Sequence, residues 1–264
     1  MLTIHSISKH FGGIRAVDRC SFEIETGKIT GLIGPNGAGK TTLFNIIAGS
    51  LKPTAGQILL AGTPVTGLTP HQLFQRGLVR TFQIPRELSH MTVQENLMLV
   101  PPAQMGENLL ASWWQWRQVQ RQERRIREQA DAVLEQLNLT QVRHELAANL
   151  SGGQKKLLEL GRILMSEPRV ILLDEPGAGV NRTLLSQLTQ LIQQLNRERG
   201  YTFCIIEHNL DLVSDLCDHV VVMAEGKVIT QGKMDEIRRN PYVQEAYLGT
   251  VAIPDASSVE EVHS

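Results

Sequence analysis

A glycine-rich segment near the N-terminus has the residue types of a phosphate-binding loop. It runs Gly34-Pro-Asn-Gly-Ala-Gly-Lys40-Thr41 and fits the pattern G-x-x-x-x-G-K-[ST]. The glycines let backbone N–H groups turn toward an anion, and the start of a following helix adds partial positive charge. Lys40 can then reach the β- and γ-phosphates of a nucleoside triphosphate, while the Thr41 hydroxyl can bind Mg²⁺. We expect the nucleotide to contact Gly34, Pro35, Asn36, Gly37, Ala38, Gly39, Lys40, Thr41 and Thr42.

Two adjacent carboxylates, Asp174 and Glu175, follow the apolar run 170–173. At the carboxyl end of a buried parallel strand, such a pair lies beside the phosphate loop. Asp174 is then placed to hold Mg²⁺ through water, and Glu175 is placed to polarise the attacking water. Alternatively, the two acids merely begin a loop, an interpretation that the upstream phosphate loop disfavours.

A serine followed by two glycines forms a second candidate anion site. In Leu150-Ser-Gly-Gly-Gln154, Ser151 can cap the following helix, and Gly152 and Gly153 expose backbone N–H groups at its positive end. Helix caps followed by glycine occur in many proteins, so the pentapeptide is informative only in its context. Here it lies 20 residues before Asp174, counted from Gln154, and far downstream of a phosphate loop.

The segments around these residues predict an α/β fold. Strands are predicted at 2–7, 21–24, 29–33, 57–60, 169–173, 201–206, 219–223 and 227–230, and helices at 40–48, 151–165 and 181–199. The phosphate loop therefore lies between a strand and a helix, which disfavours a chance match by an ordinary glycine-rich turn. Alternating strands and helices predict a largely parallel sheet covered by helices.

The middle of the chain has a different composition. Residues 93–139 are rich in helix formers and are interrupted by Pro101-Pro102, so we expect a helical subdomain at about 84–165, inserted into an α/β domain of residues 1–250. The last residues, 251–264, are acidic and rich in small side chains, and they predict a flexible C-terminal tail.

With these motifs in this order, residues 1–250 resemble the ABC-transporter ATPases. The resemblance implies a P-loop NTPase cassette with a mainly parallel core sheet, an antiparallel β subdomain and the inserted helical subdomain. It also implies ATP and Mg²⁺ as ligands, and a head-to-tail dimer in which Ser151 and Gly153 of one cassette contact the γ-phosphate on the other, with Gly152 and Gln154 beside them. Because the chain has one copy of each half-site, a second ATPase subunit, identical or related, must complete the pocket.

Three further positions match the family residue by residue, and a fourth departs from it. Gln83 resembles the glutamine that senses Mg²⁺ and the attacking water, although it could be only an exposed polar strand end. His208 resembles the histidine that hydrogen-bonds the γ-phosphate, although a lone histidine is more often structural. Phe11 resembles the aromatic residue that stacks on adenine, although phenylalanine near a hairpin is often core. Asn181 replaces the aspartate usual in the family, which loses a charge at a position that communicates across the dimer.

Three segments, 175–181, 206–213 and 240–249, resemble importers of branched-chain and other neutral amino acids, and the long helical middle resembles the larger of their two ATPase subunits. The resemblance implies transmembrane permease subunits as partners and, indirectly, a periplasmic binding protein. Urea or amide importers, lipopolysaccharide exporters and soluble ABC ATPases remain alternatives. Trp113, Trp114 and Trp116 beside several arginines fit either a permease or membrane contact or, preferably, a packed subdomain with a solvated face.

Composition and charge restrict the partners. The chain has 26 Lys and Arg against 27 Asp and Glu, for a formal charge of −1, so there is no electrostatic reason to expect nucleic acid as a partner. Apolar runs such as 170–173 are far shorter than the roughly 20 residues that span a bilayer. We therefore expect a chain bound peripherally, through its partners, at the cytoplasmic face of the inner or plasma membrane.

Overall fold

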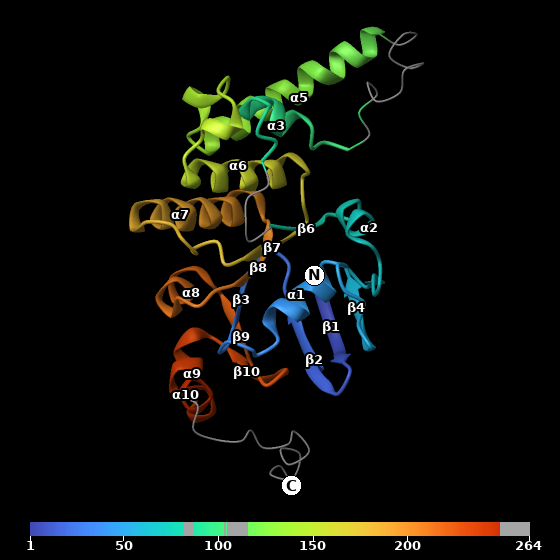
Figure 1. Ribbon diagram of the computed structural model, residues 1–264, viewed down its shortest axis with the longest axis vertical. Helices are drawn as coiled ribbons and strands as arrows, with labels where there is room; N and C mark the ends of the chain where they lie inside the picture. Colours follow the sequence, from blue (N-terminus) through green and yellow to red (C-terminus); the bar gives the residue numbers. More distant parts are fainter. Residues whose placement is uncertain (82–86, 103, 105–115, 249–264) are drawn as a thin grey trace.

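The computed structural model describes residues 1–81, 87–102, 104 and 116–248. A six-stranded sheet at its centre has the order β10-β9-β3-β8-β7-β6 (Figure 1). The neighbouring pairs from β9 to β6 are parallel, and β10 alone runs antiparallel to its neighbour. The strands are β3 (Ile29–Ile33), β6 (Leu78–Arg80), β7 (Val170–Asp174), β8 (Thr202–Ile206), β9 (His219–Ala224) and β10 (Lys227–Gly232). This arrangement confirms the predicted mainly parallel core sheet.

The central strands are apolar runs because helices and a second sheet cover both of their faces. Every residue of β3, β7 and β8 is buried. Successive side chains point to opposite faces: Leu172 shares a core cluster with Phe44 of α1 (Lys40–Ile47), and Leu173 shares another with Leu188 of α7 (Arg182–Arg199). Because both faces of the central strands are covered, the strands hold a fixed position, and so do the polar motif residues that follow their ends.

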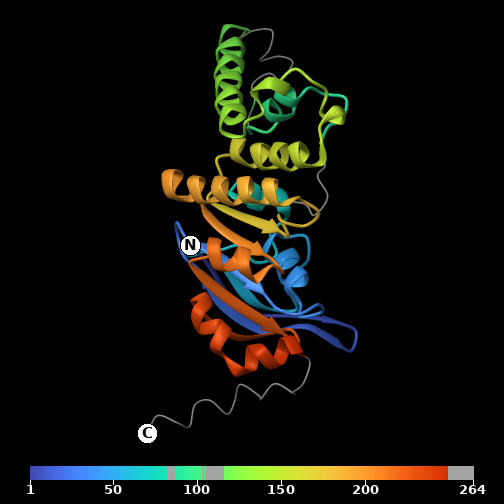
Figure 2. The same cartoon turned by 90° about the vertical axis from the view of Figure 1, so that its left-hand side faces the viewer.

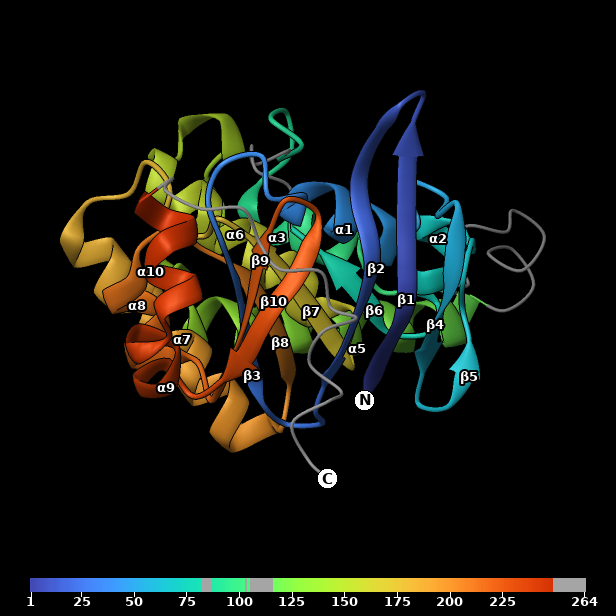
Figure 3. The ribbon, with the colours of Figure 1, turned by 90° about the horizontal axis from the view of Figure 1, so that it is seen from below.

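A separate antiparallel sheet has the order β2-β1-β4-β5 and packs on the α1 side of the core. Its strands are β1 (Leu2–Phe11), β2 (Ile14–Ile24), β4 (Ala55–Leu60) and β5 (Thr63–Pro64). The hairpin of β1 and β2 projects beyond the rest of the sheet (Figure 3). The antiparallel subdomain is therefore confirmed, but its first two strands are longer than predicted because their outer ends are exposed and lose the alternation of apolar residues.

Helices α3, α5 and α6 gather at one end of the molecule, beyond α7 (Figures 1 and 2). Their bounds are α3 (Val93–Met98), α5 (Trp116–Gln136) and α6 (Gly152–Met165), with short 3₁₀ turns at Thr140–Val142 and Ala147–Asn149. Buried residues of α3, α5 and α6 belong to the same core cluster as one face of the central sheet. The inserted helical region therefore packs continuously onto the α/β core.

Short helices at the opposite end of the molecule were not predicted. They are α8 (Leu210–Leu216), α9 (Met234–Arg239) and α10 (Pro241–Leu248), and a further short helix, α2 (Pro70–Phe74), precedes β6. Helices of one or two turns are too short to show a clear helical period. In the part of the chain that the structure describes, no helix combines the length and apolarity needed to cross a bilayer.

Candidate nucleotide-binding and catalytic site

The phosphate loop joins β3 to α1, and two of its glycines are required by their surroundings. Gly34 has φ of 149°, and a Cβ there would lie 2.0 Å from the carbonyl oxygen of Met223. Gly39 has φ of 94°, and a Cβ there would lie 2.4 Å from the carbonyl oxygen of Ala16. The loop is therefore wedged between β9 and β2, which fixes the direction of its backbone amides.

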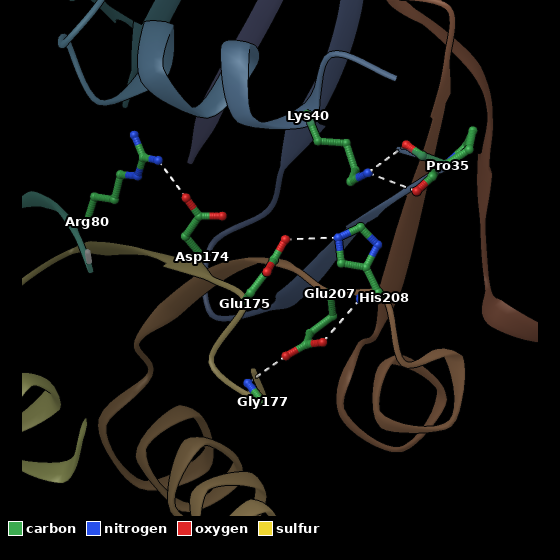
Figure 4. Close-up of polar contacts among 9 residues, drawn as sticks. Pro35, Lys40, Arg80, Asp174, Glu175, Gly177, Glu207 and His208 are labelled. Carbon is green, nitrogen blue, oxygen red and sulfur yellow. Dashed lines mark hydrogen bonds and ion pairs between the residues drawn. The ribbon is translucent and has the colours of Figure 1, made fainter. Parts of the chain in front are cut away.

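Lys40 begins α1 and turns its side chain back into the loop. Its Nζ donates hydrogen bonds to the carbonyl oxygens of Gly34, at 2.8 Å, and Pro35, at 2.9 Å (Figure 4). Burial lowers the pKa of the Lys40 ammonium, and the negative charges of Glu175 and Asp174 oppose that effect. Lys40 therefore places a buried cation inside a glycine-rich loop at a helix start, where both the cation and the backbone amides can bind phosphate. Of the other predicted positions, Ala38 is buried, Thr42 is half-buried, and Asn36, Gly37 and Thr41 are exposed.

Substituting Gly34 tests the packing of the loop. We expect Gly34→Ala to lower the free energy of unfolding by at least about 2 kcal/mol, because a methyl group adds steric conflict to an unfavourable backbone conformation. Gly37→Ala is the control, because Gly37 also has positive φ, at 81°, but has open space around a Cβ. We expect that control to cost only about 1 kcal/mol. Urea denaturation measures both, and equal losses would contradict the wedged loop.

Asp174 ends β7 and is buried, with 6% exposure. Its Oδ2 accepts a hydrogen bond from Arg80 Nη2 at 2.6 Å (Figure 4). Arg80 Nη1 also donates to Asn45 Oδ1 at 2.6 Å. Arg80 thus links the end of β7 to α1, the helix that follows the phosphate loop. Sequence reasoning missed this arginine. The available signal was a charged residue at the end of the apolar stretch of β6.

Glu175 and His208 meet beside the loop. His208 Nε2 lies 2.9 Å from Glu175 Oε1. Glu175 immediately follows β7 and His208 lies two residues after β8, and these two strands are neighbours in the sheet. Glu175 has φ of 50°, in the left-handed region, and its N–H donates to the carbonyl oxygen of Ile206. That conformation costs about 1–2 kcal/mol for a residue with a side chain. The carboxylate and imidazole are placed to orient a water molecule and a phosphate oxygen.

The Ser151 segment lies on a different surface. Ser151 caps α6: its Oγ accepts from the Gln154 N–H at 3.3 Å, and Gln154 Oε1 accepts from the Ser151 N–H at 2.9 Å, which confirms the predicted cap. Together with Gly152 and Gly153 these residues line an open groove of about 1060 Å³, which also includes Asn181 but no residue of the phosphate loop. Among the described residues, the groove at Ser151 and the phosphate loop do not form one pocket.

Asn181 has a local role in the structure. Its Oδ1 accepts a hydrogen bond from the Leu184 N–H at 2.9 Å and so caps α7. Asparagine and aspartate are about equally good N-caps. Replacing the family's usual aspartate therefore removes a charge from the groove without removing the cap.

Of the remaining predicted residues, the structure describes Phe11 and Trp116. Phe11 is 49% exposed at the end of β1, with Lys9 Nζ 5.2 Å from the ring centroid. An exposed ring at the end of a projecting hairpin is available for stacking on a planar base. Gln83, Trp113, Trp114 and the tail 251–264 lie outside the described residues, and Trp116 is 59% exposed.

The side chains near the phosphate loop suit a magnesium ion that is bound jointly by the protein and by the phosphates of a nucleotide. Among the described residues, no group of three or more His, Cys, Asp and Glu side chains is placed to hold a metal. Mg²⁺ is commonly held by one or two protein oxygens together with phosphate and water oxygens. The Thr41 hydroxyl and the Asp174 carboxylate are donors of that kind.

Comparison with known proteins agrees with this geometry. The sequence pattern described as ABC transporter matches residues 17–178, and the one described as branched-chain amino acid ATP-binding cassette transporter matches residues 227–253. The probable branched-chain amino acid transport ATP-binding protein LivG of Archaeoglobus fulgidus is 41% identical over 250 residues, which cover 94% of this chain and 95% of that protein. The high-affinity branched-chain amino acid transport ATP-binding protein BraF of Pseudomonas aeruginosa is 39% identical, with coverage of 94% and 98%.

A solved structure shares the whole arrangement. The ADP conformation of an ATP-binding cassette of an ABC transporter superposes with a TM-score of 0.80 at 38% identity, covering 94% of this chain and 98% of that one. Sequence pattern, overall identity and fold agree along nearly the full length. The chain therefore belongs to the ABC transporter family, as one of its ATP-binding and ATP-hydrolysing cassettes.

Proposed function

We propose that this chain is the ATPase subunit that energises an importer of branched-chain amino acids. The match of residues 227–253 to the branched-chain amino acid cassette pattern carries this proposal, because it distinguishes the chain from ABC ATPases in general. Curated relatives at about 40% identity that are named for branched-chain amino acid transport support it. The chain then acts as a peripheral subunit at the cytoplasmic face of a membrane.

In this proposal the residues at the strand ends handle ATP. The loop 34–42 and Lys40 bind the phosphates, and Phe11 stacks on the adenine. Thr41, Asp174 and Gln83 are the candidate holders of Mg²⁺, which when bound would neutralise charge on the phosphate oxygens. Glu175 polarises the attacking water, and His208 hydrogen-bonds the γ-phosphate. The contact between Glu175 and His208 at 2.9 Å supports a shared task for these two side chains.

The proposal requires partners. The groove at Ser151 is open and separate from the phosphate loop, which supports a head-to-tail dimer with a second ATPase subunit. Permease subunits form the path through the membrane, a periplasmic binding protein selects the cargo, and nucleic acid has no part. The cargo specificity resides in those partners rather than in this chain.

Transport measurements test the function. Complexes isolated from native membranes with the tagged chain are reconstituted into proteoliposomes that expose the ATPase face to ATP. We expect ATP-dependent movement of labelled leucine when the binding protein is supplied, and none with Lys40→Ala. ATP hydrolysis without leucine transport, but with transport of urea or another solute, would overturn the proposed cargo.

A further inference from the structure

The loop 176–178, directly after Glu175, is held from both sides by charged side chains of other elements. It is part of the connection from Glu175, directly after β7, to Asn181, the N-cap of α7. Two backbone hydrogen bonds lie within this connection: the Ala178 N–H donates to the carbonyl oxygen of Glu175, at 3.0 Å, and the Val180 N–H donates to that of Gly177, at 3.4 Å. Both are local turns, so contacts with side chains of other elements are what tie the loop to the sheet and to the helical region.

Glu207 holds the loop from the side of the sheet. It directly follows β8, is 5% exposed, and its Oε1 accepts a hydrogen bond from the Gly177 N–H at 2.7 Å. Its other oxygen, Oε2, accepts from the His208 N–H at 3.1 Å (Figure 4). A Cβ on Gly177 would lie 2.8 Å from Glu207 Oε1, so the absence of a side chain there permits the contact. One buried carboxylate thus connects the backbone of Gly177, two residues after Glu175, with the backbone of His208.

Lys156 holds the loop from the side of the helical region. It lies on α6, two residues after Gln154, and its Nζ donates hydrogen bonds to the carbonyl oxygens of Pro176, at 3.1 Å, and Ala178. Burial lowers the pKa of the Lys156 ammonium, and Glu159, Glu207 and Glu175 act against that effect. The ammonium therefore lies in the field of the same carboxylates that surround the loop.

We propose that Glu207 and Lys156 are positioning residues that clamp the loop 176–178 between β8 and α6, and so hold Glu175 and His208 in their mutual geometry. The proposal rests on the proposed ATPase function of this site. Neither residue touches the reacting atoms. The clamp also gives α6, whose N-terminus carries Ser151, a direct connection to the loop after Glu175, so that movement of this helix is transmitted to the catalytic carboxylate.

Glu207→Gln is the most specific test, because both partners of this side chain are N–H donors. A carboxylate offers an acceptor to each, whereas an amide must turn its own NH₂ group toward one of them. We expect kcat for ATP hydrolysis to fall by about tenfold or more, with KM for ATP nearly unchanged, because one hydrogen bond to buried backbone is lost. Asp211→Asn is the matched control, because Asp211 lies four residues further on, its side chain is 93% exposed, and we expect no change in kcat.

Lys156→Met and the double variant test whether the two side chains act on one loop. We expect Lys156→Met also to lower kcat with ATP affinity retained. In the double variant Glu207→Gln/Lys156→Met, the loss should be smaller than the product of the two single losses, because residues acting through one structural unit are not additive. Multiplicative losses would show that the residues act independently and would overturn the clamp.

Hydrogen–deuterium exchange gives a readout that does not depend on turnover. We expect the amides of 175–181 to exchange faster in Glu207→Gln than in the unmodified chain, while the core strands keep their protection. Unchanged exchange in this segment, or unchanged kcat alongside an active wild type, would overturn the clamp and leave the ATPase function standing. An inactive wild type would instead count against the proposed function, with the exchange result still deciding the clamp.

Discussion

Replacing Glu175 by glutamine is expected to lower ATP hydrolysis by at least about a hundredfold, while ATP binding is retained. Glutamine has nearly the same shape as glutamate and can still hydrogen-bond His208, so the geometry at the end of β7 survives. It cannot accept a proton from the attacking water, so the chemical step is lost. Phosphate release measures the turnover, and a fluorescent nucleotide measures the binding.

The same variant should accumulate an ATP-bound dimer. If hydrolysis is what normally opens the dimer, a chain that binds ATP without hydrolysing it remains closed, and gel filtration in ATP should show twice the mass of the chain. Glu167→Gln is the matched control. Glu167 is also a non-glycine residue with positive φ, at 49°, but it is exposed and precedes the start of β7, whereas Glu175 follows the end of that strand. Rapid hydrolysis in Glu175→Gln would remove this residue from the catalytic role proposed for it.

The sequence allowed the central sheet and the order of its motifs to be predicted, because buried parallel strands are short apolar runs with clear ends. The strand predicted at 29–33 matches β3, and the motif residues Asp174 and His208 lie at or just after strand ends as expected. The parallel order then brings these ends to one edge of the sheet. Local pattern was sufficient for this part of the site.

The contacts that hold the site together could not be predicted in the same way. Arg80 and Asp174 are 94 residues apart, and Glu207 and Gly177 are 30 residues apart. No spacing rule links such pairs, because the strand order β3-β8-β7-β6 cannot be predicted from the hydrophobic periodicity of any single segment. In the sequence, Lys156 has no feature that distinguishes it from other helix residues. Only the packing of α6 beside the loop 176–178 shows its hydrogen bond to Pro176. Position along the chain indicated the candidate reacting groups, and only the fold showed which side chains contact them.

Charge at the Ser151 cap should control closure of the dimer. In the Glu175→Gln background, we expect Ser151→Asp to weaken ATP-dependent dimerisation by at least about a hundredfold while ATP still binds the phosphate loop. Aspartate is as good an N-cap as serine, so α6 keeps its start. Its carboxylate would, however, face the γ-phosphate bound by the other cassette. Two unit charges about 4 Å apart repel by about 4 kcal/mol at an effective dielectric constant near 20, which exceeds the effect predicted here.

Two controls separate charge at the groove from damage to the helix. Thr92→Asp adds the same charge at the N-cap of α3, where Thr92 has the same capping box with Glu95, and we expect dimerisation to be unchanged. Ser151→Asn keeps the cap without adding charge, and we expect a smaller loss than with aspartate. Sedimentation of each variant with ATP measures the association. Full dimerisation of Ser151→Asp would mean that this helix start does not meet the γ-phosphate, and the open groove would then need a different occupant.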